Sequence, residues 1–172
     1  GANAAISYKN LNPNLTIGLV DKAIFPRDKS CGDAIGPGVI NALKRFNNEH
    51  ILDGEPQVVS TTLYGPDNIG IQNYIPEVKN KEDSIVYVIP RIDLDNRILN
   101  LAKDSGVDVY EGYSFVDFTS NEDRSLNVQI KNDKHNIEFL TKILVGADGA
   151  NSRIRKKLNY KPNSDWHKAI AI

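Results

Sequence analysis

The only cysteine of the chain, Cys31, lies in the stretch DKAIFPRDKSCGDAIGPG, which runs from Asp21 to Gly38 and is rich in glycine, proline and charged residues. A single cysteine cannot form an internal disulfide, and no base that would activate a thiolate nucleophile stands beside it in the sequence. Two interpretations remain open. Cys31 either faces a ligand cavity or is a small apolar residue of the core, which is how most free cysteines behave.

A glycine and an acid are spaced as in a dinucleotide-binding unit, because Asp21 follows an apolar run about 20 residues after Gly1. In such a unit, glycines let the backbone approach a pyrophosphate at a helix N-terminus, and the acid accepts hydrogen bonds from a ribose. If Gly1 is the last glycine of a G-x-G-x-x-G turn, a strand and further glycines precede it, and we expect the chain to be an internal fragment. The same spacing also occurs without a ligand.

A second candidate site lies in VGADGANSRIR, where an apolar strand is expected to end at Gly-Ala-Asp-Gly. The glycines leave the backbone bare, so Asp148 could accept a hydrogen bond from a sugar or ribityl hydroxyl, while Ser152 could cap the following helix. The start of that helix would favour a nearby phosphate. The alternative is a tight Asp-Gly turn before a capped helix, and the spacing supports both interpretations equally.

The hydrophobic pattern predicts the elements that would position these residues. Helices are predicted in the first residues, from about Gly38 to Phe46 with Pro37 near the start, and over DLDNRILNLAKDSG with a stop at Gly106. Buried strands are predicted in LTIGLVDK, VDVYEG and ILVGAD, and the alternating runs SFVDFTS, LNVQIKN and NIEFLTK predict a β-meander. The β-rich pieces VVSTTLYG, IGIQNYIP and SIVYVIP predict a separate antiparallel patch. This mixture indicates an α/β fold, or a mixed α/β fold with a second β layer.

The composition is that of an ordinary globular protein, with 40% hydrophobic and 25% charged residues over 172 positions. The formal net charge is -1 and basic residues are spread along the chain, which argues against nucleic acid as a partner. No run approaches the ~18 apolar residues of a membrane span. The three histidines are too scattered to indicate a ligand set, so no metal site is predicted.

Four segments together carry a family resemblance: the unit from Gly1 to Asp21, PRDKSCGDAIGPG, IPRIDLDNRILNLAKDSGVDV, and VGADGANSRIRKKL. In this order they resemble the FAD-dependent geranylgeranyl reductases, which share a fold group with the aromatic hydroxylases related to p-hydroxybenzoate hydroxylase. The resemblance extends over nearly the whole chain. The Asp-Gly motif marks the wider fold group, whereas the spacing of Arg27, Lys29, Cys31 and Gly32 is typical of the reductases.

The resemblance implies a Rossmann-type FAD-binding domain with a three-stranded β-meander, interleaved with part of an antiparallel β-sheet substrate domain. Residues 1–57 and 91–160 would form the two parts of the FAD domain, residues 58–90 a portion of the substrate domain, and residues 161–172 the start of a further substrate-domain strand. The chain stops before the second Gly-Asp motif of the family and before most of the substrate domain. This again leads us to expect an internal fragment.

The resemblance also assigns roles to single residues. Asp21 would bind the adenosine ribose, Arg27 and Arg91 would lie along the FAD, and Asp148 and Gly149 would lie at its pyrophosphate and ribityl part. Cys31, which the resemblance implies as a catalytic residue, would lie with Gly32 near the isoalloxazine ring and shape the place where a substrate double bond meets the flavin. The remaining predicted cofactor-binding residues are Gly1, Ala2, Lys22 and Asp33.

The expected activity is FAD-dependent reduction of C=C bonds in geranylgeranyl or other prenyl chains of a lipid or a chlorophyll-type pigment, with NAD(P)H or another reductant as electron donor. A cytoplasmic location is expected, and peripheral membrane contact is left open, as is the oligomeric state. Two alternatives stand beside this expectation. One is a flavin monooxygenase or halogenase of the same fold group, and the other is a non-catalytic, truncated flavoprotein.

Overall fold

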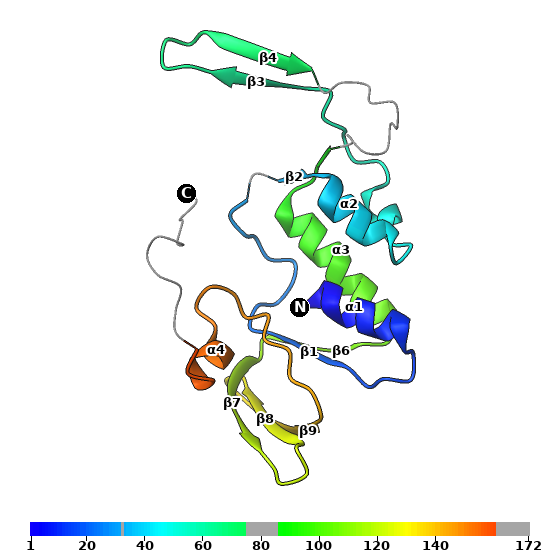
Figure 1. The fold of residues 1–172 in the computed structure, drawn as a ribbon, viewed down its shortest axis with the longest axis vertical. Coiled ribbons are helices and arrows are strands. Elements are labelled where there is room, and N and C mark those ends of the chain that lie inside the picture. Colours follow the sequence, from blue (N-terminus) through cyan, green and yellow to red (C-terminus); the bar gives the residue numbers. More distant parts are fainter. Residues whose placement is uncertain (32, 75–85, 161–172) are drawn as a thin grey trace. The chain divides into compact units, whose positions relative to one another are not determined.

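The computed structural model describes residues 1–31, 33–74 and 86–160 (Figure 1). The chain divides into two compact units: the first joins Gly1–Phe25 to the part from Leu99 onward, and the second is Pro26–Ile98. The domain boundaries expected at residues 57, 90 and 160 stay predictions. The substrate-domain strand expected at residues 161–172 lies outside the described residues.

The first unit contains a helix, α1 (Ala2–Leu11), followed by strand β1 (Gly18–Asp21), which pairs in parallel with β6 (Asp108–Glu111). Parallel strands need a long crossover connection, and here the chain between them includes the whole second unit. The register places Asp21 opposite Glu111. The carboxyl ends of both strands therefore meet at one edge of the sheet, with acids on each.

Helix α3 (Arg91–Asp104) begins in the second unit and ends in the first. Its apolar side chains Leu94, Ile98, Leu99 and Ala102 are buried, as their helical spacing predicts. The predicted stop at Gly106 is confirmed, since this residue has φ +80°, its N–H bonds to the Lys103 carbonyl, and the next N–H bonds to the Ala102 carbonyl. This pair of bonds is the Schellman arrangement, which satisfies the last carbonyls of a helix.

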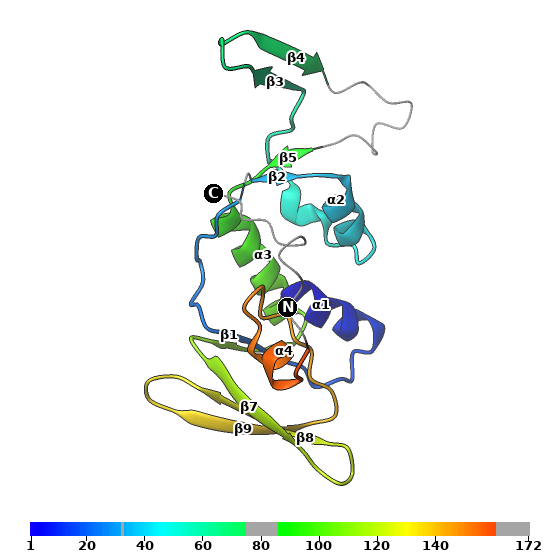
Figure 2. The same cartoon turned by 60° about the vertical axis from the view of Figure 1, so that its left-hand side comes forward.

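The predicted β-meander is confirmed. Strands β7 (Ser114–Ser120), β8 (Leu126–Lys131) and β9 (Asn136–Thr141) form one antiparallel sheet in the first unit, with a register shift between Phe115 and Asp117 (Figure 2). Val128 and Ile130 of the central strand are buried. The ring of Tyr110 on β6 lies edge-on to Phe139 of β9, with centroids 5.0 Å apart, which packs the meander against the parallel pair.

The second unit contains helix α2 (Pro37–Lys44) and a short 3-10 helix, η1 (Glu49–Leu52). Pro37 stands in the first turn of α2, where its missing N–H costs no intrahelical bond. The helix ends two residues before the predicted Phe46, and Asn47 then adopts φ +56°, which terminates helical geometry. Ile40 and Leu43 are buried, as their spacing predicts.

The predicted antiparallel patch is confirmed in part. Strands β3 (Ser60–Tyr64) and β4 (Gly70–Tyr74) pair with each other, whereas β5 (Tyr87–Val88) forms its ladder with β2 (Ala34–Ile35). The third β-rich piece still contacts the start of the first, since Tyr87 forms an isolated antiparallel bridge with Gln57 and the Val58 N–H donates to the Val86 carbonyl. Burial of Ile89 and Ile35 beside the β2–β5 ladder explains the choice of partner. The part of the patch at residues 75–85 lies outside the described residues.

The strand expected in ILVGAD does not form. Residues 143–149 have no regular secondary structure, and Ile143 is 72% exposed. A strand needs a neighbour to accept and donate its ladder hydrogen bonds, and within residues 1–31, 33–74 and 86–160 no strand pairs with this segment. An apolar run alone could not reveal that. None of the helices in the described part of the chain is long and apolar enough to cross a membrane.

Candidate functional site

Asp21 stands at the last position of β1, where the resemblance places the ribose-binding acid. Its Oδ1 accepts a hydrogen bond from the Ala23 N–H at 2.9 Å. Within the described part of the chain no other group donates to this carboxylate, so Oδ2 is available to a ligand hydroxyl. Lys22 follows directly and is exposed. The position of Asp21 thus fits the predicted contact with a sugar diol.

The start of α1 offers backbone donors. Gly1 is the N-cap and carries no capping side chain, and its carbonyl accepts the N–H of Ala5 at 3.1 Å. The N–H groups of the first turn have no acceptor within a helix, so such a helix start attracts anions. A Cβ on Gly1 would lie 3.2 Å from Leu19 Cδ1 and 3.9 Å from Ala147 Cβ. Glycine therefore allows the close approach of helix, strand and the segment before Asp148.

Glu111, which the sequence analysis did not single out, fixes the loop after Asp21. Its Oε2 accepts the Phe25 N–H at 2.7 Å, and its Oε1 accepts from Lys103 Nζ at 2.7 Å. The hydrogen bond from Lys103 and the one from the Phe25 N–H lower the pKa of Glu111. The Tyr113 N–H also donates to the Asp21 carbonyl at 3.2 Å. The end of β1 is thereby held to the end of β6.

Asp148 is engaged in capping α4 (Arg153–Lys157). One of its oxygens accepts from Ser152 Oγ at 2.6 Å, and the other accepts the N–H groups of Arg153 at 2.7 Å and Ile154 at 3.3 Å. Burial raises the pKa of Asp148, but these hydrogen bonds outweigh that effect and leave the pKa below its usual value. Ser152 also accepts the Arg155 N–H, so its predicted role as helix cap is confirmed.

The geometry around Asp148 therefore supports the turn and capped helix that the sequence left as an alternative. Gly149 has φ +79°, which the tight turn requires. The predicted contact of Asp148 and Gly149 with FAD stays a prediction. The proximity of Ala147 to Gly1 places this turn next to the start of α1 within the first unit.

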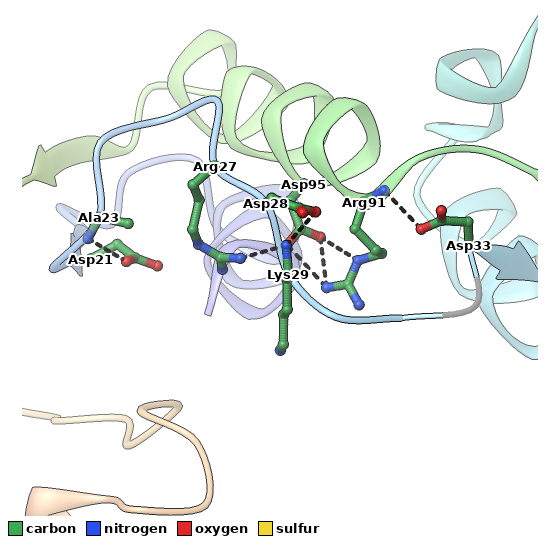
Figure 3. Close-up of polar contacts among 8 residues, drawn as sticks. All are labelled: Asp21, Ala23, Arg27, Asp28, Lys29, Asp33, Arg91 and Asp95. Carbon is green, nitrogen blue, oxygen red and sulfur yellow. Dashed lines mark hydrogen bonds and ion pairs between the residues drawn. The ribbon is translucent and has the colours of Figure 1, made fainter. Parts of the chain in front are cut away.

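The second unit contains a cluster of charged residues around Asp95 (Figure 3). Arg91 Nε and Nη2 donate to the Asp95 carboxylate at 3.0 and 2.8 Å, and Arg27 Nη1 donates to it at 3.2 Å. Two arginines predicted from the resemblance thus share one partner. Sequence reasoning missed Asp95, although its i,i+4 spacing from Arg91 on a helix was a visible signal.

Asp33 and Cys31 lie in the loop before β2. Asp33 has φ +55°, its carboxylate accepts the Arg91 N–H at 3.1 Å, and its carbonyl accepts the Ile89 N–H at 3.0 Å. Cys31 is exposed, so the interpretation as a buried core residue does not match this structure. Hydrogen bonds from the Arg91 side chain and from the Asp33 backbone lower the pKa of the Cys31 thiol. Gly32 lies outside the described residues.

The predicted site residues therefore form two sets, each within its own unit. The first unit brings together Gly1, Ala2, Asp21, Lys22, Asp148 and Gly149 around the start of α1 and the end of β1. The second unit brings together Arg27, Cys31, Asp33 and Arg91 through Asp95 and the start of α3. In the first unit, a helix start without a capping side chain and the Asp21 carboxylate suit phosphates and sugar hydroxyls, and in the second unit the paired guanidiniums suit an anion.

Comparison with known proteins decides the family. Residues 47–169 match the model of the FAD binding domain. The chain belongs to this family. FAD is therefore its cofactor, as the resemblance implied, and the mixed α/β fold expected for an FAD-binding domain is confirmed.

Known proteins with different functions are similar to this chain in sequence. The chain is 29% identical over 150 residues to the menaquinone reductase of Mycolicibacterium smegmatis, covering 87% of the chain and 34% of that protein. It is 26% identical to the conditioned medium factor receptor 1 of Dictyostelium discoideum, covering 92% of the chain and 33% of that protein. The chain thus spans about a third of the length of the relatives it matches.

The fold is that of the flavin-dependent halogenases and monooxygenases. The flavin-dependent halogenase CmlS superposes with a TM-score of 0.76 at 18% identity, covering 92% of this chain and 29% of that one. The flavin-dependent monooxygenase PieE, solved with FAD and substrate, gives 0.74 at 13% identity, covering 92% and 30%. The wider fold group named by the resemblance is confirmed, whereas the narrower assignment to the geranylgeranyl reductases stays a prediction.

Proposed function

We propose that the chain forms part of an FAD-dependent oxidoreductase that reduces C=C bonds in a prenyl chain. The observation that carries this proposal is the similarity to the menaquinone reductase of M. smegmatis over 87% of the chain. Menaquinone is a quinone with a prenyl chain, so the substrate class of that relative contains the bonds in question. When bound, FAD in its reduced form would supply a hydride to one carbon of the bond while a proton would add to the other, and NAD(P)H or another reductant would restore the reduced flavin.

The residues of the first unit would bind the cofactor. The first-turn N–H groups of α1, beginning at Ala2, face no capping side chain and would receive phosphate oxygens. Asp21 would accept hydrogen bonds from the ribose through its free Oδ2. Asp148 would act mainly by ordering the turn with Gly149, because its oxygens already accept three donors.

The residues of the second unit would orient the flavin and the substrate. Arg27 and Arg91 present guanidinium donors that suit phosphate oxygens. Asp33 holds the loop that carries Cys31 to the start of α3. Cys31 is exposed, and we propose that it faces the place where the double bond meets the flavin.

The decisive experiment compares the products of the intact, FAD-loaded protein with a prenylated quinone and a geranylgeranyl lipid. The reductant is supplied in anaerobic and in aerated buffer, and the molecular masses of the products are measured by mass spectrometry. We expect products that gain a pair of hydrogens per bond reduced, equally well without oxygen. Oxygen-dependent turnover and a product that gains oxygen or halogen would instead support the second candidate, a monooxygenase or halogenase, which the shared fold with CmlS favours.

A non-catalytic flavoprotein is the remaining alternative. The similarity to the conditioned medium factor receptor 1 of D. discoideum supports this alternative, because a receptor binds a partner and need not catalyse a reaction. An intact protein that retains no flavin after purification and reconstitution would support it and would overturn the proposed reduction.

A further inference from the structure

Asp95 connects the two arginines that are proposed to lie along the cofactor. Its Oδ1 accepts from Arg91 Nε at 3.0 Å and Nη2 at 2.8 Å, and its Oδ2 accepts from Arg91 Nη2 at 3.0 Å and Arg27 Nη1 at 3.2 Å. The Asp95 side chain is only 13% exposed, whereas those of Arg27 and Arg91 are 29% and 21% exposed. Figure 3 shows the carboxylate between the two guanidiniums, which come from different segments of the chain.

The charges of this cluster leave it suited to an anion. Two guanidiniums repel each other, and one shared carboxylate offsets that repulsion, leaving a formal excess of one positive charge over these three residues. Because Asp95 accepts two hydrogen bonds from Arg91 in a fork, it fixes the plane of that guanidinium and not only its distance. Side-chain freedom that is lost before binding does not have to be lost on binding.

The backbone also anchors the cluster. The Asp33 carboxylate accepts the N–H of Arg91 at 3.1 Å, which ties the start of α3 to the loop before β2. Asp95 lies one turn further along the same helix, α3. The helix therefore presents both the arginine and the carboxylate that orients it.

We propose that Asp95 is a positioning residue for FAD binding: it holds the guanidiniums of Arg27 and Arg91 in one fixed arrangement that receives the phosphate groups of the cofactor. This inference rests on the proposed function, in which these arginines lie along the FAD. Asp95 itself does not touch the cofactor. It acts by pre-ordering two cations that would otherwise repel each other.

The direction in which FAD affinity changes when Asp95 is substituted distinguishes a positioning role from a purely electrostatic effect. Asp95→Asn removes a negative charge next to an anion site, so charge alone predicts tighter FAD binding. A positioning role predicts weaker binding, by about tenfold to a hundredfold, because the fork to Arg91 is lost. The dissociation constant of FAD, measured at fixed ionic strength by quenching of flavin fluorescence on the intact apoprotein, distinguishes the two.

Glu55, in the loop after η1, offers a matched control because its ion-pair partner lies on α3. It pairs with Arg97 of α3, its side chain is 17% exposed, and it belongs to the same unit as Asp95. Glu55→Gln therefore removes an ion pair of similar burial without touching Arg27 or Arg91. We expect it to lower the thermal midpoint as Asp95→Asn does, while leaving the FAD dissociation constant unchanged.

Asp95→Glu keeps the proposal testable if Asp95→Asn does not fold. This variant retains the charge but moves it by one methylene, so FAD binding should weaken severalfold, less than in the asparagine variant. Unchanged or tighter FAD binding in the folded Asp95 variants would overturn the positioning role while the proposed function stands. Absence of FAD binding by the wild-type protein would instead overturn the proposed function, and this inference with it.

Discussion

Several carboxylates accept backbone N–H groups of residues that end a strand loop or begin a helix. Glu111 accepts from Phe25, Asp33 from Arg91 and Asp148 from Arg153, and each of these bonds orders a loop or a helix start. Hydrogen bonds to an ionised acceptor are stronger than neutral ones. The ordering of these segments therefore depends on the ionised state of single side chains.

Asp148 allows a prediction of pH dependence. Its pKa is lowered in the folded protein, so its contribution to stability is present above the ordinary aspartate pKa of about 3.9 and is lost as the pH falls through the folded value. Asp148→Asn should lower the free energy of unfolding by about 1 kcal/mol at neutral pH, as loss of a helix cap does. The difference from wild type should shrink in acid, which thermal unfolding of the intact protein at several pH values would measure.

The control for this prediction is Asp133→Asn. In the described part of the chain no donor bonds to the Asp133 carboxylate, and its turn is held instead by Asn132 Oδ1. This variant should unfold at the wild-type temperature throughout the pH series. A deficit in Asp148→Asn that stays constant down to strongly acidic pH would contradict a role of the ionised carboxylate.

Cys31 allows a prediction about turnover. Because the side chain is exposed, its removal creates no cavity in the core. Cys31→Ala in the intact enzyme should retain bound FAD and the wild-type thermal midpoint, but change the rate of prenyl reduction or the pattern of products. Unchanged kinetics with both prenylated substrates would show that the thiol has no part in the reaction.

At the scale of elements, the backbone joins helix α3 to strand β6 through a left-handed glycine. Gly106 has φ +80°, and a Cβ built there would lie 3.4 Å from Lys9 Cε. The end of α3 is thus set by backbone conformation, and β6 starts two residues later in register with β1. Through this join the last turns of α3 lead directly into the parallel strand pair of the first unit.

Gly106→Ala should therefore destabilise the protein by about 1–2 kcal/mol, the cost of left-handed backbone for a residue with a Cβ. Gly38→Ala is the matched control, because Gly38 lies in α2 and a Cβ there meets nothing within 4 Å. Alanine is the better helix former, so this change should be neutral or stabilising by up to about 1 kcal/mol. Thermal midpoints of the intact variants would test the pair, and equal midpoints would contradict the argument.

The β3–β4 hairpin differs from the meander strands in its exposure to solvent. Every residue of β4 is exposed, and apolar side chains such as Leu63, Ile71 and Tyr74 are 65–71% exposed. A two-stranded hairpin is marginal by itself, and exposed apolar surface of this kind is typical of surfaces that bind something. Its assignment to a substrate domain stays a prediction.

At the scale of the whole molecule, the chain consists of two units and spans about a third of the length of its curated relatives. Each unit contributes one set of predicted cofactor residues. A ligand that binds the folded state stabilises it by mass action, by about 2.7 kcal/mol when its concentration is a hundred times the dissociation constant.

FAD should accordingly raise the thermal midpoint of the intact apoprotein in a concentration-dependent way. Riboflavin, which has the flavin ring but no phosphate, should stabilise much less if the helix start of α1 and the arginines bind phosphate groups. Differential scanning fluorimetry at increasing ligand concentration would measure this. An equal shift with riboflavin would contradict the proposed phosphate contacts.

Elements whose signals are local could be predicted from the sequence alone. Apolar spacing in α3, Pro37 at the start of α2, Gly106 as a stop and the alternation of the meander strands were all sufficient, because each depends on neighbours along the chain. Asp21 and the Asp-Gly motif also stood out, since their spacing is tied to a backbone shape. Resemblance then indicated the cofactor before any geometry was known.

The pairings between distant segments depend on the folded chain. Tyr87 and Val88 form a ladder with Ala34–Ile35 and not with the β3–β4 hairpin, and Ile143 has no strand partner in the described part of the chain, because pairing depends on which backbone lies alongside. In the same way, Asp95 accepts from Arg27, which lies 68 residues away in the sequence, as well as from its helix neighbour Arg91. The local signal could predict the second of these contacts, whereas the first exists only because folding brings the two segments together.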